Sequence, residues 1–577
     1  MSKRALTPAP LPSAKRLHTS GHPVYRPNQL LNFENSLYDE LILCIFSHLS
    51  WIDLCVTQAT SKNWARLAAD NELWRIQYLN HYGRTRLRGA KGFIGRLDGR
   101  EVRPLPGRAK ADQYKDWKWM FRISSNWRKG RCVVESSLDP STPHSNLTER
   151  ATPPFPSEAE RTLIILAGSL IISATSRTTN LPAITITNDQ NQHHTVQIPY
   201  QDDTDFTGIS ALALDQSPPT SGHLSLACFL RNGGISVLEF NHSSPSNAIQ
   251  KYTYLPSRGS TRLQNVIHAV YYHPLLATLS NTFSLSIYDL SSSTIRHTQT
   301  LSSFTSYPPA SLILSCLSPM NFKLVIAYSV PVYPRHWSIG ATELILSGSS
   351  EPHVGTSSNA AGFSSASFRE DYKYPLSSMI SVISSRTIRA FDVPSGWVDE
   401  SSLRAMREQW GRKLSSVADA QTDGKWVIIA PGESQSYEHD NAHSSISPSS
   451  GSESSSPSPV SASLHSPTNL QLYRLILPSQ STSISASPPK LNFVRTLHGQ
   501  TGPVSSLALA DGRCVSLGLN GSIWVWDLEG GTGAEVAPAD QSLGNQTSQA
   551  MVGTVSFDER RIVTAHAGSV VVRRFDI

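Results

Sequence analysis

The chain carries two contrasting patterns of apolar and polar residues. In residues 37–50 the apolar positions fall on one face of a helix, at Leu41, Ile42, Ile45, Phe46 and Leu49. From 132 to 577, helical periodicity is almost absent outside 400–412, and short β-prone runs alternate with Gly, Asn or Ser turns. The pattern therefore predicts a small helical module followed by a much larger all-β region.

The helical module has more apolar surface than it can bury alone. Asp39 and Asp53 are expected to cap its first two helices, and two further amphipathic segments follow, "SKNWARLAAD" and "ELWRIQY". A module of this size is marginal by itself, so the excess apolar surface must pack on the rest of the chain or on another protein.

The apolar series Glu40-Leu41, Ile45-Phe46, Asp53-Leu54 and Leu73-Trp74 resembles an F-box over 34–80, with Tyr38 where that family has proline. In F-box proteins this module docks on the Skp-type adaptor of SCF ubiquitin ligases and, through it, on a cullin scaffold. The alternative is a helical cap on the following domain. The resemblance implies that the adaptor contacts are Leu37, Leu41, Ile42, Ile45, Phe46, Leu49, Leu54, Trp64, Leu67, Leu73 and Trp74.

Residues 81–130 are expected to form a basic linker. The segment 84–131 holds fifteen Lys and Arg against four Asp and Glu, in a chain of net charge +6. Trp117, Met120 and Phe121 share one helical face, and "NWRKG" ends at a glycine that can stop the helix. This segment resembles the connector between F-box and propeller in F-box proteins with WD repeats. Its charge can also bind nucleic acid, although a solvated linker is the favoured interpretation.

The clearest β unit is "VSSLALADGRCVSLGLNGSIWVWDLEGG", which reads as three strands joined by Asp-Gly and Asn-Gly turns and ending in Trp-Asp. Weaker copies occur at 224–240, 274–290, 379–393 and 560–577. A period of roughly forty to fifty residues with an aromatic-Asp ending resembles WD repeats, which implies an all-β propeller over 131–577.

The blade count is expected to be seven or eight, with eight slightly preferred. The fifth candidate for a third strand, 386–393, lacks a clear first strand. The last candidate reaches Ile577, and "RCVVES" at 131–136 is expected to supply its outer strand and so remove an exposed sheet edge. The eight candidates are 183–188, 233–240, 283–290, 339–347, 386–393, 469–475, 521–528 and 568–577.

The hydrogen-bond network typical of WD repeats is expected to be degraded. In that family it uses a Gly-His pair before the first strand and an Asp in a later turn. Here the order is His498-Gly499, and Asn520 stands at the Asp position.

Composition predicts disorder at 1–30 and in insertions near 350–372 and 433–468, the second between the second and third strands of a blade. An unselected surface insertion and a target of Pro-directed kinases both fit this second segment. Four of its serines precede proline: Ser447, Ser456, Ser458 and Ser466.

No apolar run approaches about eighteen residues, so no membrane-spanning helix is expected. Lys3-Arg4 and Lys15-Arg16 resemble a weak bipartite nuclear signal, which leaves both nucleus and cytoplasm open.

The sequence indicates a binding protein rather than an enzyme. It contains no Gly-rich phosphate loop, His-Glu-x-x-His, Gly-x-Ser-x-Gly or Cys/His cluster, and its six cysteines lack paired spacing. We therefore expect no catalytic residue, cofactor or metal.

The leading hypothesis is a substrate receptor that holds a captured protein near a ubiquitin-loaded conjugating enzyme. A propeller scaffold without a ligase role and a nucleic-acid-binding protein are the alternatives. Related propellers often recognise phosphorylated segments through arginines on one face. Arg231 and Arg386 are expected in turns before a third strand, and Arg177 is a further candidate; the alternative is that all three are ordinary solvated arginines.

Overall fold

The computed structural model contains two compact units, one ending at Gln77 and one running from Tyr78 to Ile577. No helix in the described part of the chain is long and apolar enough to cross a lipid bilayer. The structure describes residues 37–82, 116–137, 161–199, 207–217, 223–256, 265–318, 320–332, 336–348, 380–391, 399–432, 468–477, 488–510, 512–539, 553–566 and 569–577. The tail at 1–30, the expected insertions and most of the basic linker lie outside these ranges.

The first unit is helical. It consists of α2 (Asp39–Phe46), α3 (Trp51–Thr57), α4 (Lys62–Ala68) and the start of α5 (Asn71–Tyr82). The rings of Phe46 and Trp64 meet edge to face at 5.6 Å, and the indole nitrogen of Trp74 donates to the carbonyl of Ala68 at 2.9 Å. These contacts join the helices around one small apolar core.

The helix caps differ from those expected from the sequence. Tyr38 precedes α2 and makes no capping side-chain bond, while Asp39 lies in the first turn. Ser50, rather than Asp53, caps α3: its hydroxyl accepts from the Asp53 amide at 3.3 Å and donates to the Asp53 carboxylate at 2.7 Å. A serine three residues before an acidic residue suits a capping arrangement, which places the helix start earlier than expected.

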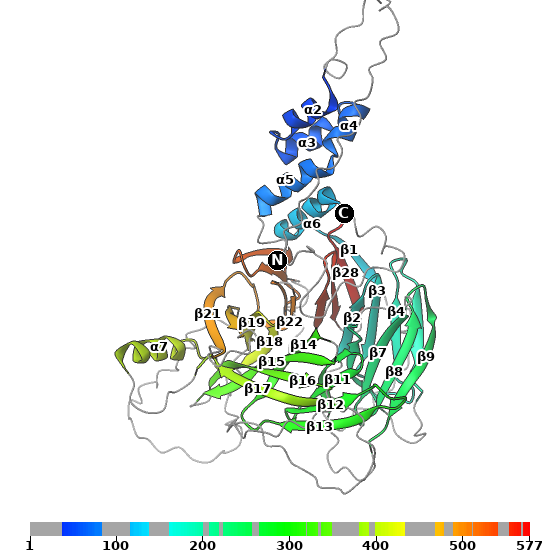
Figure 1. Cartoon of the computed structure of the whole chain (residues 1–577), viewed down its shortest axis with the longest axis vertical. Helices are drawn as coiled ribbons and strands as arrows, with labels where there is room; N and C mark the ends of the chain where they lie inside the picture. The colour runs from blue at the N-terminus through cyan, green and yellow to red at the C-terminus, as the bar shows by residue number, and fades with distance from the viewer. Residues whose placement is uncertain are drawn as a thin grey trace, which may run out of the picture. The chain divides into compact units, whose positions relative to one another are not determined.

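The second unit is a seven-bladed β-propeller, in which every blade is a four-stranded antiparallel sheet (Figure 1). The first strands of neighbouring blades contact one another around a closed ring. The first three blades are β2 (Thr162–Ala167), β3 (Leu170–Thr175), β4 (Ala183–Thr187), β5 (His193–Gln197); β6 (Ile209–Leu214), β7 (His223–Leu230), β8 (Ile235–Asn241), β9 (Ser244–Tyr254); and β10 (Val266–Tyr272), β11 (Leu275–Ser280), β12 (Ser284–Asp289), β13 (Arg296–Ser302).

The remaining blades follow in chain order, and β1 completes the seventh. They are β14 (Tyr307–Ser318), β15 (Asn321–Val332), β16 (His336–Ser347), β17 (Ser381–Arg389); β18 (Val417–Thr422), β19 (Trp426–Pro431), β20 (Leu470–Ile476), β21 (Lys490–Leu497); β22 (Val504–Ala510), β23 (Arg513–Gly518), β24 (Ile523–Asp527), β25 (Thr532–Ala537); and β26 (Thr554–Phe557), β27 (Arg561–His566), β28 (Ser569–Arg574) with β1 (Val133–Ser137). A separate helix, α7 (Glu400–Trp410), stands between β17 and β18.

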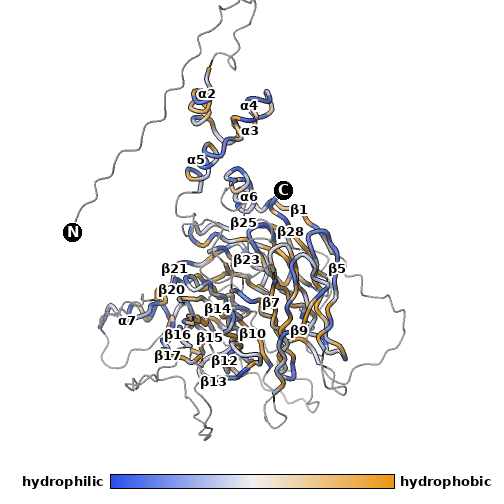
Figure 2. The backbone as a smooth tube through the Cα atoms, turned by 45° about the vertical axis from the view of Figure 1, so that its right-hand side comes forward, coloured by the Kyte–Doolittle hydropathy of each residue, from blue (hydrophilic) through white to orange (hydrophobic). Residues whose placement is uncertain are grey.

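Second strands form the centre of each blade and are apolar on both faces. All six residues of β11 and all six of β19 are buried, because each strand lies between two others and between two neighbouring blades. Figure 2 shows these apolar stretches along the strands of the propeller. Burial on both faces explains why these runs lack the strict alternation of a half-exposed strand.

The count of seven corrects the slight preference for eight. The candidate at 386–393 is not a third strand; it overlaps β17, which is the outer strand of the fourth blade and pairs with β16. The insertion expected at 433–468 does fall between second and third strands, since β19 ends at Pro431 and β20 begins at Leu470.

The ring is closed by a strand from before the repeats, as the sequence predicted. β1 pairs antiparallel with β28, from Val133 opposite Arg574 to Ser137 opposite Val570. The helix α6 (Trp117–Lys129) directly precedes β1 and ends at Gly130, whose φ of 66° is the left-handed conformation that favours glycine. Helix and closing strand are therefore placed together.

Helix α6 packs on the closing blade. The rings of Trp127 and Phe575 stack at 3.9 Å, and the Trp127 indole donates to the carbonyl of Glu559 at 2.9 Å. Asn126 donates to the carbonyl of Phe575 at 2.8 Å. The last residues of the chain are thus held by the helix that introduces the first strand.

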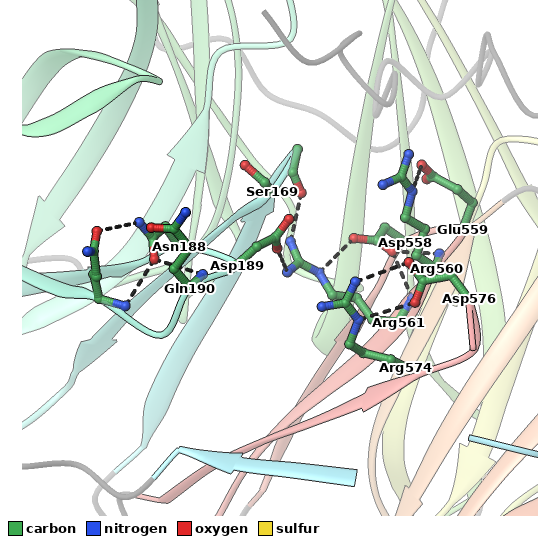
Figure 3. A network of polar contacts seen from close by, with 12 residues as sticks. Ser169, Asn188, Asp189, Gln190, Asp558, Glu559, Arg560, Arg561, Arg574 and Asp576 are labelled. Atoms are coloured by element: carbon green, nitrogen blue, oxygen red, sulfur yellow. Dashed lines mark hydrogen bonds and ion pairs between the residues drawn. The ribbon is translucent and has the colours of Figure 1, made fainter. Parts of the chain in front are cut away.

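A buried arginine joins the seventh blade to the first (Figure 3). The Arg561 guanidinium lies 3.1 Å from Asp558 on its own blade and 3.1 Å from Asp189 on the first blade. It also donates to the carbonyl of Gly168 at 2.7 Å. Three oxygen acceptors from two blades therefore surround one cation.

The hydrogen-bond network of the sixth blade is complete, contrary to the expectation of a degraded one. A glutamine, rather than a histidine, links the third strand to the turn. Trp526 Nε1 donates to Ser516 Oγ at 3.0 Å, and this hydroxyl donates to Gln500 Oε1 at 2.6 Å. Gln500 Nε2 donates to Ser522 Oγ at 2.9 Å, which in turn donates to Asn520 Oδ1 at 2.6 Å. His498 instead bonds to Asn469 at 3.0 Å.

A chain that begins at residue 111 is expected to fold, whereas one that begins at residue 140 lacks α6 and β1 and exposes the edge of β28. We expect the shorter chain to be insoluble, or to unfold at a temperature lower by roughly 10 °C or more. Thermal unfolding followed by circular dichroism measures the difference, and equal midpoints would show that β1 does not close the ring.

Arg561→Ala should lower the free energy of unfolding by about 3–5 kcal/mol, because it leaves Asp558 and Asp189 without their shared cation. Arg561→Lys should recover only part of this, since one ammonium cannot reproduce the planar fork. Arg404→Ala is the control: that side chain is 84% exposed and lies 3.7 Å from Glu408, so the change should stay within about 0.5 kcal/mol. Denaturant unfolding of the three variants checks the ranking.

Candidate functional site

The propeller has two faces, and helix α6 packs on only one of them. Turns between first and second strands and between third and fourth strands lie on the face that carries α6, since α6 contacts Glu559 between β26 and β27. Turns between second and third strands, and the connections between blades, lie on the other side. We call these the α6 face and the opposite face.

The first unit exposes large apolar side chains on its first two helices. Leu41 is 50% exposed and Ile45 44%, on α2; Ile52 is 54% exposed and Val56 62%, on α3. Each pair lies four residues apart, which places its members on one side of the helix. Exposed apolar stripes of this kind mark surfaces that bind other proteins.

The structure divides the eleven residues expected to contact an adaptor. Leu41 and Ile45 are exposed, and Leu37, Leu49 and Trp64 are partly buried. The other six are buried in the core of the unit and cannot contact a partner directly. Replacing them could affect adaptor binding only indirectly, by changing how the exposed helices are positioned. These six are Ile42, Phe46, Leu54, Leu67, Leu73 and Trp74.

Ile52 and Val56 were not among the residues expected from the sequence. The pattern "WIDLCVT" places Leu54, which is buried, on the inner side of α3. Residues 52 and 56, two positions on either side of Leu54, therefore point away from the core. A helical projection of this segment could have identified Ile52 and Val56, because it places them on the side opposite Leu54.

Two of the three candidate arginines lie close together on the opposite face. Arg177 is in the turn between β3 and β4 and is exposed; Arg231 is in the turn between β7 and β8 and is partly buried. Gly208 lies between them: a Cβ added there would be 2.6 Å from the carbonyl oxygen of Ser176, and the Gly208 carbonyl accepts from the Arg231 amide at 2.9 Å.

Arg161 is a neighbour that the sequence interpretation missed. It precedes β2 and is exposed, and its amide donates to the hydroxyl of Ser176 at 2.8 Å, next to Arg177. Residues that precede a first strand lie on the same face as the turns that precede third strands. This rule could have identified Arg161 from the sequence. Three arginines thus belong to blades one and two of this face.

Arg386 does not belong to this group, and its expected place in a turn was wrong. It lies within β17, opposite Glu343 of β16. The buried Glu343 carboxylate is 2.8 Å from Lys323 Nζ and 4.0 Å from the Arg386 guanidinium. Arg386 therefore helps to neutralise a buried acid within the fourth blade.

Titratable groups inside the propeller serve the packing of its blades. The Asp419 carboxylate on β18 accepts from the amide of Leu507 on β22 at 2.7 Å, and loss of solvation raises its pKa above the usual value, against the effect of this bond. Burial also raises the pKa of the Cys228 and Cys514 thiols, which keeps them protonated at neutral pH. Among the described residues, no group of three or more His, Cys, Asp and Glu is arranged to hold a metal ion.

Comparisons with known proteins agree with this architecture. Residues 36–80 match the family described as F-box-like. A curated relative, the probable E3 ubiquitin ligase complex SCF subunit sconB of Arthroderma otae, is 28% identical over 123 residues. This match covers 18% of the chain and 18% of the relative.

Among solved structures, the β-propeller domain of Cps50 (Swd1) from Myceliophteria thermophila aligns with 72% of this chain and 96% of its own, at 8% identity and a TM-score of 0.35. The computationally designed Ika8 protein aligns with 71% of this chain and 95% of its own, at 8% identity and a TM-score of 0.33. Both TM-scores are too low to bear on the fold.

The propeller itself gives the most extensive match. Residues 151–559 match the family described as F-box protein pof12 beta-propeller, and this range covers well over half of the chain. With an F-box-like module before it, the chain belongs to the family of F-box proteins that carry a pof12-type β-propeller.

Proposed function

We propose that this protein is the substrate receptor of an SCF-type ubiquitin ligase, with the first unit binding a Skp-type adaptor and the propeller binding a protein substrate. The observation that carries the proposal is the exposed apolar surface of α2 and α3 on a unit whose own core is already complete. A partner helix or groove that covers Leu41, Ile45, Ile52 and Val56 would remove this surface from water.

In this role the protein supplies proximity rather than chemistry. A substrate held on the propeller and an adaptor held by the first unit bring a lysine near a conjugating enzyme, which converts an encounter in solution into one within a complex. The proposal assigns no catalytic residue to this chain.

Phosphorylated segments are one substrate class that the opposite face suits. Arg161, Arg177 and Arg231 come from blades one and two, and arginine makes paired, charge-assisted hydrogen bonds to phosphate. Nucleic-acid binding through the basic linker could not use the Trp127 ring, because that ring stacks on Phe575 of the propeller.

Replacing Leu41 and Ile45 together by alanine should weaken adaptor binding by roughly thirtyfold or more, because two interface anchors that each contribute about 1 kcal/mol or more together account for at least about 2 kcal/mol. Thermal stability should stay nearly unchanged, since both side chains are already exposed. Isothermal titration of the purified adaptor measures the affinity.

Two single variants serve as controls for this experiment. Ile42→Ala removes a buried side chain and should destabilise the first unit by about 2–5 kcal/mol. Ile249→Ala alters a propeller residue that is 70% exposed and should change neither stability nor adaptor binding. Full adaptor affinity in the Leu41/Ile45 double variant would refute the proposed docking surface.

Replacing Arg177 and Arg231 together by alanine should reduce capture of serine- and threonine-phosphorylated peptides by about tenfold or more, while adaptor binding persists. Lysine at both positions should also weaken capture, since it keeps the charge without the planar fork. Pull-down from a phosphorylated peptide pool, with and without phosphatase, measures the effect.

Arg386→Ala is the matched control, because that arginine is engaged with Glu343 within its blade. It should leave peptide capture unchanged. Capture that resists both phosphatase and the Arg177/Arg231 change would contradict phosphate recognition at this site.

A further inference from the structure

A second surface on the opposite face combines exposed aromatic rings with cations. It is built from three segments where the fourth blade meets its neighbours: residues 303–307 between β13 and β14, residues 389–391 at the end of β17, and residues 399–414 with α7. We call it the α7 surface. Figure 1 shows α7 at the rim of the propeller, next to β17 and β21.

Direct contacts join the first two segments to the fourth blade. The Arg389 guanidinium donates to Thr305 Oγ1 at 3.0 Å. The ring of Tyr307 meets that of Trp337, near the start of β16, at 5.6 Å. The loop before β14 is therefore fixed against the ends of β16 and β17.

The third segment is tied to the same blade. Trp337 exchanges two backbone hydrogen bonds with Leu414, of 2.7 and 2.8 Å. The rings of Phe391 and Trp410, at the end of α7, lie 5.5 Å apart. The α7 surface is thus continuous through these contacts.

Large apolar side chains of this surface are exposed to solvent. Phe304 is 80% exposed, and Trp410 on α7 is 38% exposed. α7 has no buried residue at all, although Leu403, Met406 and Trp410 fall on one side of it. A surface helix of a globular domain normally buries such a stripe, and aromatic residues are enriched at protein interfaces.

Cations outnumber acids on this surface, with Arg389, Arg404, Arg407, Arg412 and Lys413 against Asp399, Glu400 and Glu408. Within the described part of the chain, Arg389, Arg407 and Lys413 have no acidic partner. Lys413 Nζ lies 4.0 Å from the centre of the Trp410 ring. By contrast, Glu408 of α7 is engaged, 3.6 Å from Arg412.

A cleft beside the last turn of α7 offers room for an anchoring side chain. Its volume is about 400 Å³, and its lining mixes apolar and aromatic residues (Ala390, Tyr473, Leu491 and Phe493) with polar and charged ones (Ser338, Glu408, Gln409, Arg412 and Asn492). The Arg412 guanidinium stacks 4.1 Å from the centre of the Phe493 ring. Clefts of this size accept small ligands, and interface anchors typically fill such pockets.

We propose that the α7 surface docks an acidic segment of the protein substrate that also carries aromatic or large aliphatic residues. This inference rests on the proposed receptor function and names a substrate class for it. Its cations come from a strand end, a helix and the chain after that helix, which suits several carboxylates along a peptide rather than one phosphate group. The exposed rings of Phe304 and Trp410 take the apolar side chains, and the cleft takes a side chain with both apolar and polar atoms.

The test is a selection on the full-length protein from a displayed library of random twelve-residue peptides made in bacteria, which are not phosphorylated. We expect enriched peptides to combine Asp or Glu with Phe, Trp or Leu. A labelled peptide of that type should bind at least tenfold more weakly to Arg389→Glu/Lys413→Glu and to Phe304→Ala/Trp410→Ala. High salt should weaken it as well, because screening reduces attraction between exposed charges.

Three controls separate the outcomes. Arg128→Glu on α6 and Ile249→Ala on β9 change an exposed cation and an exposed apolar residue far from the α7 surface and should leave binding intact. Arg177→Ala/Arg231→Ala should also leave it intact. Unfolding midpoints of all variants confirm that they remain folded.

Enrichment without acidic residues, no enrichment, or equal binding by the α7-surface variants would overturn the inference. Adaptor titration of the same protein gives an independent result. Acidic-peptide binding without adaptor binding would refute the receptor function alone, and adaptor binding without acidic-peptide binding would refute the α7 surface alone.

Discussion

Closure of the ring is the constraint on which the rest of the propeller depends. Seven blades that pack face to face form a closed ring only if the last blade meets the first, and here the last blade takes its outer strand from residues 133–137. The pairing of β1 with β28 and the contacts of Arg561 with Asp189 and Gly168 act at the same junction. The strand therefore completes the seventh blade, and the buried cation links that blade to the first.

Closure of the ring by β1 also determines which face of the propeller is free to bind a substrate. Because α6 immediately precedes β1 and packs on Phe575 and the carbonyl of Glu559, it occupies the face of the first-to-second-strand turns. The turns that carry Arg177 and Arg231, and the helix α7, belong to the other face. Because the closing segment covers part of one side, the turns before third strands and the connections between blades remain available on the other side for recognition.

Local features of this fold could be predicted from the sequence, whereas strand partners could not. The helical period in 37–50, the stop of α6 at Gly130 and the helix at 400–410 each depend on a few consecutive residues. The segment 379–393 reads as strand, turn and strand, yet it forms one continuous outer strand, since β17 pairs along its length with β16. Pairing is a property of two segments, which explains the error over Arg386 and the preference for eight blades.

Hydrogen-bond networks show a related limit. The sequence has His498 before Gly499 rather than after it, but Gln500, which follows Gly499, offers both a donor and an acceptor at the right distance from Ser516 and Ser522. A histidine ring also offers two nitrogens of this kind, so the chemistry persists when the residue changes. Residue identity alone therefore underestimates how regular the sixth blade is.

The two basic regions of the opposite face have different physical characters. Arg161 and Arg177 lie beside the first strand of blade one, where the turn backbone holds them close together. Arg389 and Lys413 lie among exposed rings at blades four and five. Blades one and five are not neighbours in a ring of seven, so a single short motif would contact only one of the regions. A substrate that engaged both would need two motifs joined by a linker, and its affinity would then depend on linker length as well as on either contact.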